Sequence, residues 1–292
     1  ISDTYEPGST FKAFTTAIAL EEGLTYEDEI FSDAPIVSGD YTISCWLQKA
    51  SGTNHGDETM KQAFENSCNP IFVKLAQRIG ITKYYEYIHN FGFYDPTGID
   101  LPAEGVGIFH KKPTLIDLQA LSYGESSTVT PLQLANAYCA LVNGGKLMTP
   151  HIAKCLTDQD GNVVKEYEPE AIRTIFSEKT AERVRALMEG VVSEGTGSAG
   201  YVEGYGVAGK TSTSTIETGE YAGLHVLSFG CYAPSDDPQI VVLVVVNKPA
   251  DKLVGSSCAT RTAAKIISKT LDYMGVPRVY ADDDYTKLTT LY

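Results

Sequence analysis

The sequence predicts an α+β fold in three layers, in which helices cover both faces of an antiparallel sheet. Apolar residues recur at helical spacing through much of the first 192 positions. After residue 205, segments rich in β-branched residues alternate with turns, and an amphipathic segment over about 258–273 follows them. We therefore expect a helical lobe of about 9–192 to pack against a sheet and closing helix of about 205–275.

The helices are expected where start and stop signals frame an apolar face. Phe11, Phe14 and Ile18 predict a first helix from Ser9 to Glu22, ending at Gly23. The same criteria predict further helices over about 59–65, 70–79, 83–91, 115–123, 131–142 and 177–192.

Strands are predicted by alternation and by turn residues. Two hairpins are expected, over 35–46 and over 152–167, the second exposed to solvent. The main sheet is expected from strands over 205–214, 224–233 and 239–247. Residues 50–56 are predicted to be a loop, 94–113 an irregular excursion, and the acidic run 282–284 a solvated tail.

Composition limits the classes of partner. The 292 residues are 43% hydrophobic and carry a net charge of −14, which disfavours nucleic acid and anionic membrane surfaces as partners. The longest apolar run, Ile240 to Val246, is too short to span a membrane. The six cysteines show no disulfide-framework spacing. With no initiator Met and no signal peptide, the chain is expected to be a fragment of a longer protein.

The first candidate for chemistry is Ser9, with Lys12 one helical turn later. A serine becomes a nucleophile when a base takes its proton, and a lysine with a lowered pKa can be that base. Taken alone, the pair is better explained by an N-cap serine and a solvated lysine.

Two further motifs change this balance. Ser67 and Asn69 lie between two predicted helices, and Lys210, Thr211 and Thr213 lie on a predicted strand, where alternation places both threonines on one face. S-x-x-K, S-x-N and a K-T triplet, in this order and far apart in sequence, form the serine acyl-transferase pattern of penicillin-binding proteins and β-lactamases.

The resemblance extends beyond the triplets and covers nearly the whole chain. The segment over 5–12 resembles the nucleophile segment of class B (monofunctional) penicillin-binding proteins, closest to the division and sporulation types. The segments 129–135, 143–146, 194–197 and 207–211 resemble the same family. The family fold, shared with serine β-lactamases, has a helix and two strands before the nucleophile. The resemblance therefore implies that residues 1–292 are a transpeptidase domain whose first strands are missing.

The resemblance implies a peptidoglycan D,D-transpeptidase that β-lactams acylate, with no cofactor in the chemistry. It assigns Ser9 as the nucleophile, Lys12 as its base and Ser67 as a proton relay between Lys210 and the leaving D-Ala amine. Asn69 is implied to bind the substrate amide. The strand residues Lys210, Thr211, Ser212 and Thr213 are implied to form the carboxylate receptor, and the backbone N–H groups of Ser9 and Thr213 the oxyanion hole. A β-lactam sensor domain, a D,D-carboxypeptidase and a β-lactamase stay open as alternatives.

The strand motif departs from the family pattern. Ser212 stands where the family has glycine, so we expect retained activity with altered β-lactam selectivity. The implied partners are peptidoglycan stem peptides, β-lactams and membrane-embedded glycosyltransferase, division or sporulation proteins, but no nucleic acid. The implied location is the extracytoplasmic face of a bacterial cell membrane, with the anchor outside this chain.

A structural zinc ion is a separate possibility. Cys45, His55 and Cys68 converge on the S-x-N region, and thiolates with an imidazole suit zinc. Their spacing matches no regular zinc module, and free buried cysteines are the alternative. The arrangement resembles a subset of clostridial-type family members that carry zinc near this motif. Asp40 or Asp57 is the expected fourth ligand.

Overall fold

The computed structural model describes residues 1–216, 219–250 and 255–279, so the acidic run 282–284 lies outside the described residues. The main sheet is antiparallel with the order β11–β10–β9. Its strands are β9 (Ala208–Thr215), β10 (His225–Ala233) and β11 (Ile240–Asn247). The register places Ser212 opposite Ser228 and Thr211 opposite Phe229.

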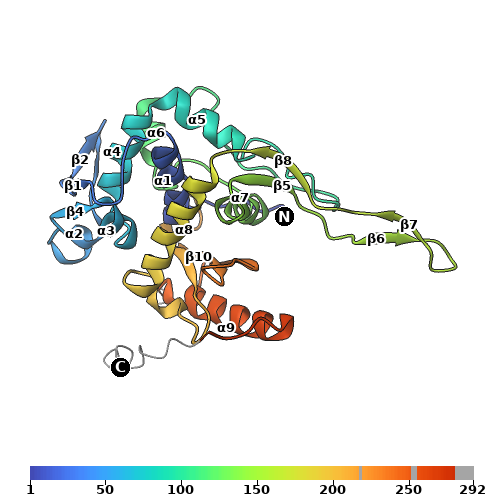
Figure 1. Ribbon diagram of the computed structural model, residues 1–292. Coiled ribbons are helices and arrows are strands. Elements are labelled where there is room, and N and C mark those ends of the chain that lie inside the picture. The colour runs from blue at the N-terminus through green and yellow to red at the C-terminus, as the bar shows by residue number, and fades with distance from the viewer. Residues whose placement is uncertain (217–218, 251–254, 280–292) are drawn as a thin grey trace.

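Helices cover both faces of this sheet, as predicted. On one face, α9 (Ser257–Met274) buries Ile267 in a cluster with Phe229 of β10. On the other face, Ala208 and Tyr232 belong to a larger buried cluster that includes side chains from α1 (Lys12–Glu21), α7 (Pro131–Val142) and other helices. In Figure 1, α9 accordingly lies on the opposite side of β10 from α1 and α7. The α+β, three-layer prediction is therefore confirmed.

The part of the chain before the main sheet is largely helical. Its elements are the 3₁₀ turn η1 (Gly8–Phe11), α1 (Lys12–Glu21), α2 (Trp46–Ser51), α3 (Met60–Glu65), α4 (Asn69–Ile79), α5 (Ile81–Asn90), α6 (Leu115–Leu121), α7 (Pro131–Val142), α8 (Glu178–Ser193) and the 3₁₀ turn η2 (Ser198–Gly200). Thr59, Thr114 and Thr130 begin α3, α6 and α7 with capping boxes. No helix in the described ranges combines the length and apolarity needed to cross a bilayer.

Four two-stranded sheets lie among the helices of this part of the chain. They pair β1 (Ile30–Ser32) with β4 (Asp57–Thr59), β2 (Ile36–Ser38) with β3 (Tyr41–Ile43), β5 (Lys146–Thr149) with β8 (Glu170–Thr174), and β6 (Cys155–Thr157) with β7 (Val163–Glu166). The β6–β7 hairpin projects away from the body in Figure 1, and every residue of β7 is exposed. The two predicted hairpins are confirmed.

Ser9 lies in the first helical turn, as predicted; this turn is the 3₁₀ helix η1, and the α-helix follows it directly from Lys12. One local prediction is wrong. The segment 50–56, predicted to be a loop throughout, begins with the end of α2, which reaches Ser51 because Gly52 supplies a left-handed C-cap at φ 75°.

An aromatic cluster fixes α1 against the helices around it. The Phe14 ring lies 4.8 Å from the Phe91 ring and 5.5 Å from the Tyr138 ring, both edge-on. Phe11 and Phe93 extend the contact, at 5.1 and 5.3 Å from Phe14. Because edge-to-face packing adds to the burial of large apolar surface, this cluster holds the start of α1 in place.

Replacing Phe14 should therefore destabilise the whole domain. Phe14→Ala is expected to lower the free energy of unfolding by about 3–5 kcal/mol, measured by denaturant titration. Tyr273→Ala is the control, since that side chain is 92% exposed and its loss should change stability by less than about 0.5 kcal/mol. Equal stability of the two variants would show that the cluster does not anchor α1.

Candidate active site

Gly8 brings the turn that carries Ser9 close to two other segments. Its N–H donates to the carbonyl of Gly124 at 2.9 Å, and its φ is 54°, a left-handed value that favours glycine. A Cβ on Gly8 would lie 2.3 Å from Ser212 Oγ and 2.4 Å from Ser214 Oγ. Only glycine therefore lets the turn sit this close to strand β9, with Ser9 half-buried beside it.

Lys12 is fully buried and surrounded by oxygen atoms of the first two motifs. Its Nζ lies 3.0 Å from Ser9 Oγ and 2.9 Å from Ser67 Oγ. It also donates to the Ser67 carbonyl at 2.7 Å and to Asn69 Oδ1 at 2.6 Å. The structure thus brings Ser9, Lys12, Ser67 and Asn69 together around one nitrogen, as the sequence predicted.

Ser67 reaches this nitrogen through an unusual backbone conformation. It lies between α3 and α4 with φ 59°, a left-handed value that costs roughly 1–2 kcal/mol for a residue with a Cβ. The turn is held because Ser67 N–H bonds the Phe64 carbonyl and Cys68 N–H bonds the Ala63 carbonyl, at 3.2 and 2.9 Å. This conformation directs both the carbonyl and the hydroxyl of Ser67 at Lys12.

Burial lowers the pKa of Lys12 to about 7, against the weaker opposing effects of Cys68, Cys45 and Glu125. Burial and the like charge of Lys12 also lower the pKa of Lys210 well below its usual range. Lys12 can therefore exist as a neutral amine near neutral pH.

Lys210 is the other fully buried lysine, and it extends from β9 toward the Phe64 ring, 5.9 Å from its centroid. Its Nζ donates weakly to the Thr211 carbonyl at 3.4 Å. Within the described residues, Ser67 bonds Lys12 and no bond joins it to Lys210. A relay of protons between Lys210 and a leaving group through Ser67 thus stays a prediction.

The hydroxyl groups of β9 face in two directions. Thr211 is buried and its Oγ1 lies 3.0 Å from Thr196 Oγ1, whereas Thr213 is exposed. Ser212 faces the nucleophile turn, where its Oγ accepts the N–H of Ser9 at 2.9 Å. Sequence reasoning missed Thr196 as a contact of Thr211, and its only signal was membership of a segment, 194–197, that resembles the family.

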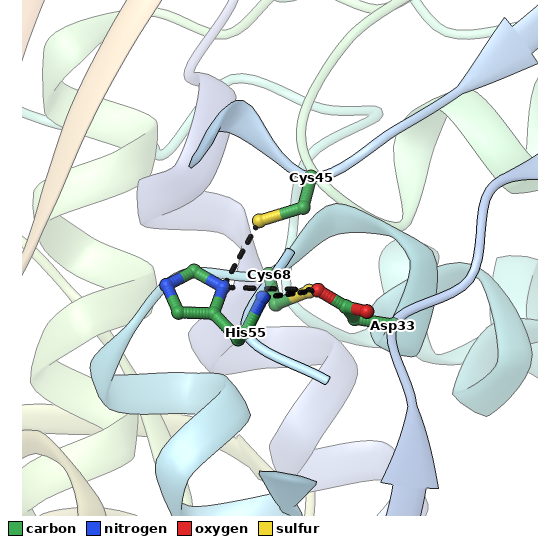
Figure 2. Close-up of side chains that lie close together, drawn as sticks. All are labelled: Asp33, Cys45, His55 and Cys68. Carbon is green, nitrogen blue, oxygen red and sulfur yellow. Dashed lines mark hydrogen bonds and ion pairs between the residues drawn. The ribbon is translucent and has the colours of Figure 1, made fainter. Parts of the chain in front are cut away.

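A second group of side chains lies directly behind the S-x-N turn. Figure 2 shows Asp33, Cys45, His55 and Cys68 pointing toward a common centre, and their potential ligand atoms all lie within 4.8 Å of one another. Cys45 Sγ lies 3.1 Å from His55 Nδ1, and that nitrogen lies 3.9 Å from Asp33 Oδ2. Asp33 also accepts the His55 backbone N–H at 2.8 Å.

The predicted fourth ligand is wrong. Asp33, which follows β1, completes the group, whereas Asp40 lies in the β2–β3 turn and Asp57 on β4, outside it. The pairing of β1 with β4 brings Asp33 beside the loop that carries His55, and no local pattern predicts this pairing. The three ligands that the sequence predicted are all in the group.

The donor set fits a tetrahedral zinc ion. Zinc ligands at 2.0–2.3 Å from a common metal stand roughly 3.3–3.8 Å apart, which the 3.1 and 3.9 Å separations bracket. Cys45, Cys68 and Asp33 are buried, and burial together with the nearby Cys45 and Glu58 raises the pKa of the Cys68 thiol. A divalent cation would compensate the negative charge that these groups carry when ionised.

Comparison with known proteins gives one consistent family. The model of the penicillin binding protein transpeptidase domain matches residues 1–268. Stage V sporulation protein D of Bacillus subtilis (strain 168) is 40% identical over 281 residues, which cover 94% of this chain and 43% of that protein. Penicillin-binding protein PbpB of Mycolicibacterium smegmatis is 34% identical, over 89% of this chain and 42% of the relative. The chain thus spans about two fifths of these relatives.

Solved structures agree with the sequence comparison. The apo form of penicillin binding protein 3 from Mycobacterium tuberculosis superimposes with a TM-score of 0.85 at 28% identity, over 96% of this chain and 66% of that one. The same protein complexed with ampicillin gives a TM-score of 0.85 at 27% identity, over 97% of this chain and 65% of that one.

The lowered pKa of Lys12 predicts how any reaction at Ser9 should depend on pH. Because the neutral amine is the base, the rate of acylation should rise about tenfold per pH unit below pH 7 and level off above about 7. Lys12→Arg should nearly abolish acylation, since a guanidinium stays protonated. Stopped-flow measurement of acylation across pH 5–9 tests this, and a flat profile in the wild type would remove the base role.

Proposed function

The chain belongs to the penicillin binding protein transpeptidase domain family, and on this premise we propose that it is a peptidoglycan D,D-transpeptidase acting through an acyl-enzyme on Ser9. One observation carries the proposal most. A buried lysine with a pKa of about 7 has its Nζ 3.0 Å from the Ser9 hydroxyl. Two further relatives support the same reaction by their names: a peptidoglycan D,D-transpeptidase FtsI homolog from Mesostigma viride and a probable peptidoglycan D,D-transpeptidase PenA from Neisseria gonorrhoeae.

Acylation begins with neutral Lys12. Its amine takes the Ser9 proton as Ser9 Oγ bonds the carbonyl carbon of the penultimate D-Ala of a stem peptide. The tetrahedral intermediate then collapses, the bond to the terminal D-Ala nitrogen breaks, and Ser67 passes to that nitrogen the proton that Lys12 took from Ser9. This leaves an ester on Ser9, free D-Ala, and Lys12 ready for the second half of the reaction.

In deacylation Ser9 becomes the leaving group, and the amine of a second stem peptide becomes the nucleophile. The amine of a second stem peptide attacks the ester carbonyl and loses its proton to the same base, and Ser9 Oγ leaves as the hydroxyl. The new amide is the cross-link. Protein side chains supply every proton transfer in this scheme, so the chemistry requires no cofactor.

The hydrogen bonds that the site residues already make within the protein indicate which of their atoms can bind substrate. Because Asn69 Oδ1 accepts from Lys12, its NH₂ group is the donor for a substrate carbonyl. Thr213 is the exposed hydroxyl of β9, and Thr211 and Lys210 lie beside it on the same strand. We assign Lys210, Thr211 and Thr213 to the terminal carboxylate of the stem peptide, whereas Ser212 faces the nucleophile turn and accepts the N–H of Ser9.

A β-lactam should acylate the same serine, because its ring amide occupies the place of the D-Ala-D-Ala bond. The relative from Mycobacterium tuberculosis has been solved in complexes with aztreonam and ampicillin, which supports this for the present chain. A β-lactamase or a D,D-carboxypeptidase would release the acyl group to water, whereas a transpeptidase or a sensor domain would keep the β-lactam adduct. The substrate also implies a location on the extracytoplasmic face of the membrane, near the glycosyltransferase and division or sporulation proteins that build the wall.

We further propose that Asp33, Cys45, His55 and Cys68 bind a structural zinc ion. Cys68 is the middle residue of the triplet Ser67-Cys68-Asn69, so an ion there would hold the turn that places both neighbours against Lys12. The ion would thereby stabilise the backbone of the turn and take no part in acyl transfer.

The nucleophile assignment predicts a specific adduct. Incubation with penicillin should add one penicillin mass to the protein, and peptide mapping should place it on Ser9. Ser9→Ala should carry none, while its melting temperature stays near that of the wild type. A lasting adduct supports a transpeptidase or a sensor domain, and fast hydrolysis of the drug supports a β-lactamase. If Ser9→Ala is still labelled as strongly as the wild type at another residue, Ser9 is not the nucleophile.

The zinc proposal predicts a coupled loss of metal and stability. Chelation should lower the melting temperature by on the order of 5–10 °C, and Cys68→Ser should show the same loss before chelation. Cys258→Ser is the control, since that thiol lies on α9, outside the group. Elemental analysis of protein purified without added metal should find one zinc per chain. If metal-free protein is as stable as the wild type, and Cys45 and Cys68 react freely with thiol reagents, the two cysteines are ordinary buried residues and not zinc ligands.

A further inference from the structure

The backbone N–H of the proposed nucleophile is already hydrogen-bonded. Ser9 N–H donates to Ser212 Oγ at 2.9 Å, across 203 positions of sequence. In a serine acyl-transferase this N–H is one of the two donors that stabilise the oxyanion of the tetrahedral intermediate. An acceptor from the protein itself thus occupies the atom that the substrate oxygen needs.

The contact follows from the residue type at position 212 and from the glycine beside Ser9. Alternation along β9 sends Lys210, Ser212 and Ser214 to the face that packs on the nucleophile turn. The missing Cβ of Gly8 leaves room for both serine side chains, since a Cβ there would lie 2.3 Å from Ser212 Oγ. Ser214 Oγ also lies beside Gly8, but it donates to the Glu6 carbonyl at 3.0 Å and does not contact the Ser9 N–H.

We propose that the Ser212 hydroxyl occludes the oxyanion site of the resting enzyme and must leave it before Ser9 can be acylated. The inference rests on the proposed acyl transfer at Ser9. Rotation about the Cα–Cβ bond to another staggered position frees the Ser9 N–H, and the substrate oxygen then takes its place. Ser212 thereby lowers the acylation rate without touching the bond that breaks.

This occlusion has a distinctive kinetic consequence. The bond from Ser9 N–H to Ser212 Oγ has to break only when the tetrahedral intermediate forms. It therefore raises the barrier to acylation and leaves the dissociation constant of the first, noncovalent complex unchanged. Losing one neutral hydrogen bond is expected to change the rate about three- to tenfold. Ser212→Ala removes the acceptor and keeps the Cβ, and Ser212→Gly removes both.

The test is saturation kinetics with a fluorescent penicillin, which separates the dissociation constant of the encounter complex from the first-order acylation rate. Ser212→Ala and Ser212→Gly should both raise the acylation rate about three- to tenfold, with the dissociation constant unchanged within about twofold. Ser214→Ala is the matched control, because it removes the neighbouring hydroxyl at Gly8 and leaves the Ser9 N–H bonded. Its acylation rate should stay near that of the wild type.

The outcomes separate this inference from the proposed function. Slower acylation in both Ser212 variants would show that the hydroxyl assists the reaction, and would overturn the occlusion. Unchanged rates with a lower melting temperature would make Ser212 a packing residue, and would overturn it equally. If Ser9→Ala still forms the adduct, the proposed function itself fails. If Ser9→Ala forms none and the Ser212 variants match the wild type, only the occlusion fails.

Discussion

The burial of one lysine amine is the constraint on which this site depends. Lys12 has no access to water, so every polar contact of its Nζ must come from the protein. A neutral amine has two N–H groups and one lone pair, and the Ser67 carbonyl and Asn69 Oδ1 are the two pure acceptors within 2.7 Å. The lone pair is then left for a hydroxyl, and Ser9 and Ser67 each place one within 3.0 Å. The contacts thus prepare the amine to accept a proton from Ser9.

The rest of the architecture serves to hold the groups around that amine. The turn between α3 and α4 carries Ser67 and Asn69, whose oxygen atoms contact Lys12. Cys68, between these two residues, belongs to the group with Asp33, Cys45 and His55 (Figure 2). The nucleophile turn is fixed on its other side by glycine. A Cβ on Gly124 would lie 2.0 Å from the Gly8 carbonyl, so two glycines in contact allow the turn to sit between the helices and β9.

Much of this could be predicted from sequence, because the relevant signals are local or lie within motifs. Helical periodicity and caps predicted α7 at 131–142, and the first two motifs predicted which residues meet at Lys12. The remainder depends on contacts between segments distant in sequence. Asp33 lies beside Cys45, His55 and Cys68 only because β1 pairs with β4. The lowered pKa of Lys12 depends on burial, which a motif does not report. Ser212 was noticed as a departure, but its bond to Ser9 requires the fold.

The most direct test of the central claim is a titration of Lys12 itself. Carbon-13 labelling of the lysine side chains, with the Lys12 resonance assigned by its absence in Lys12→Arg, would follow the Cε shift of the unliganded protein across pH 5–11. Since burial lowers the pKa to about 7, most of the shift change should be complete by pH 8, where the amine is neutral. A midpoint near the ordinary lysine value of about 10.4 would contradict the account, because Lys12 would then be a cation when Ser9 reacts.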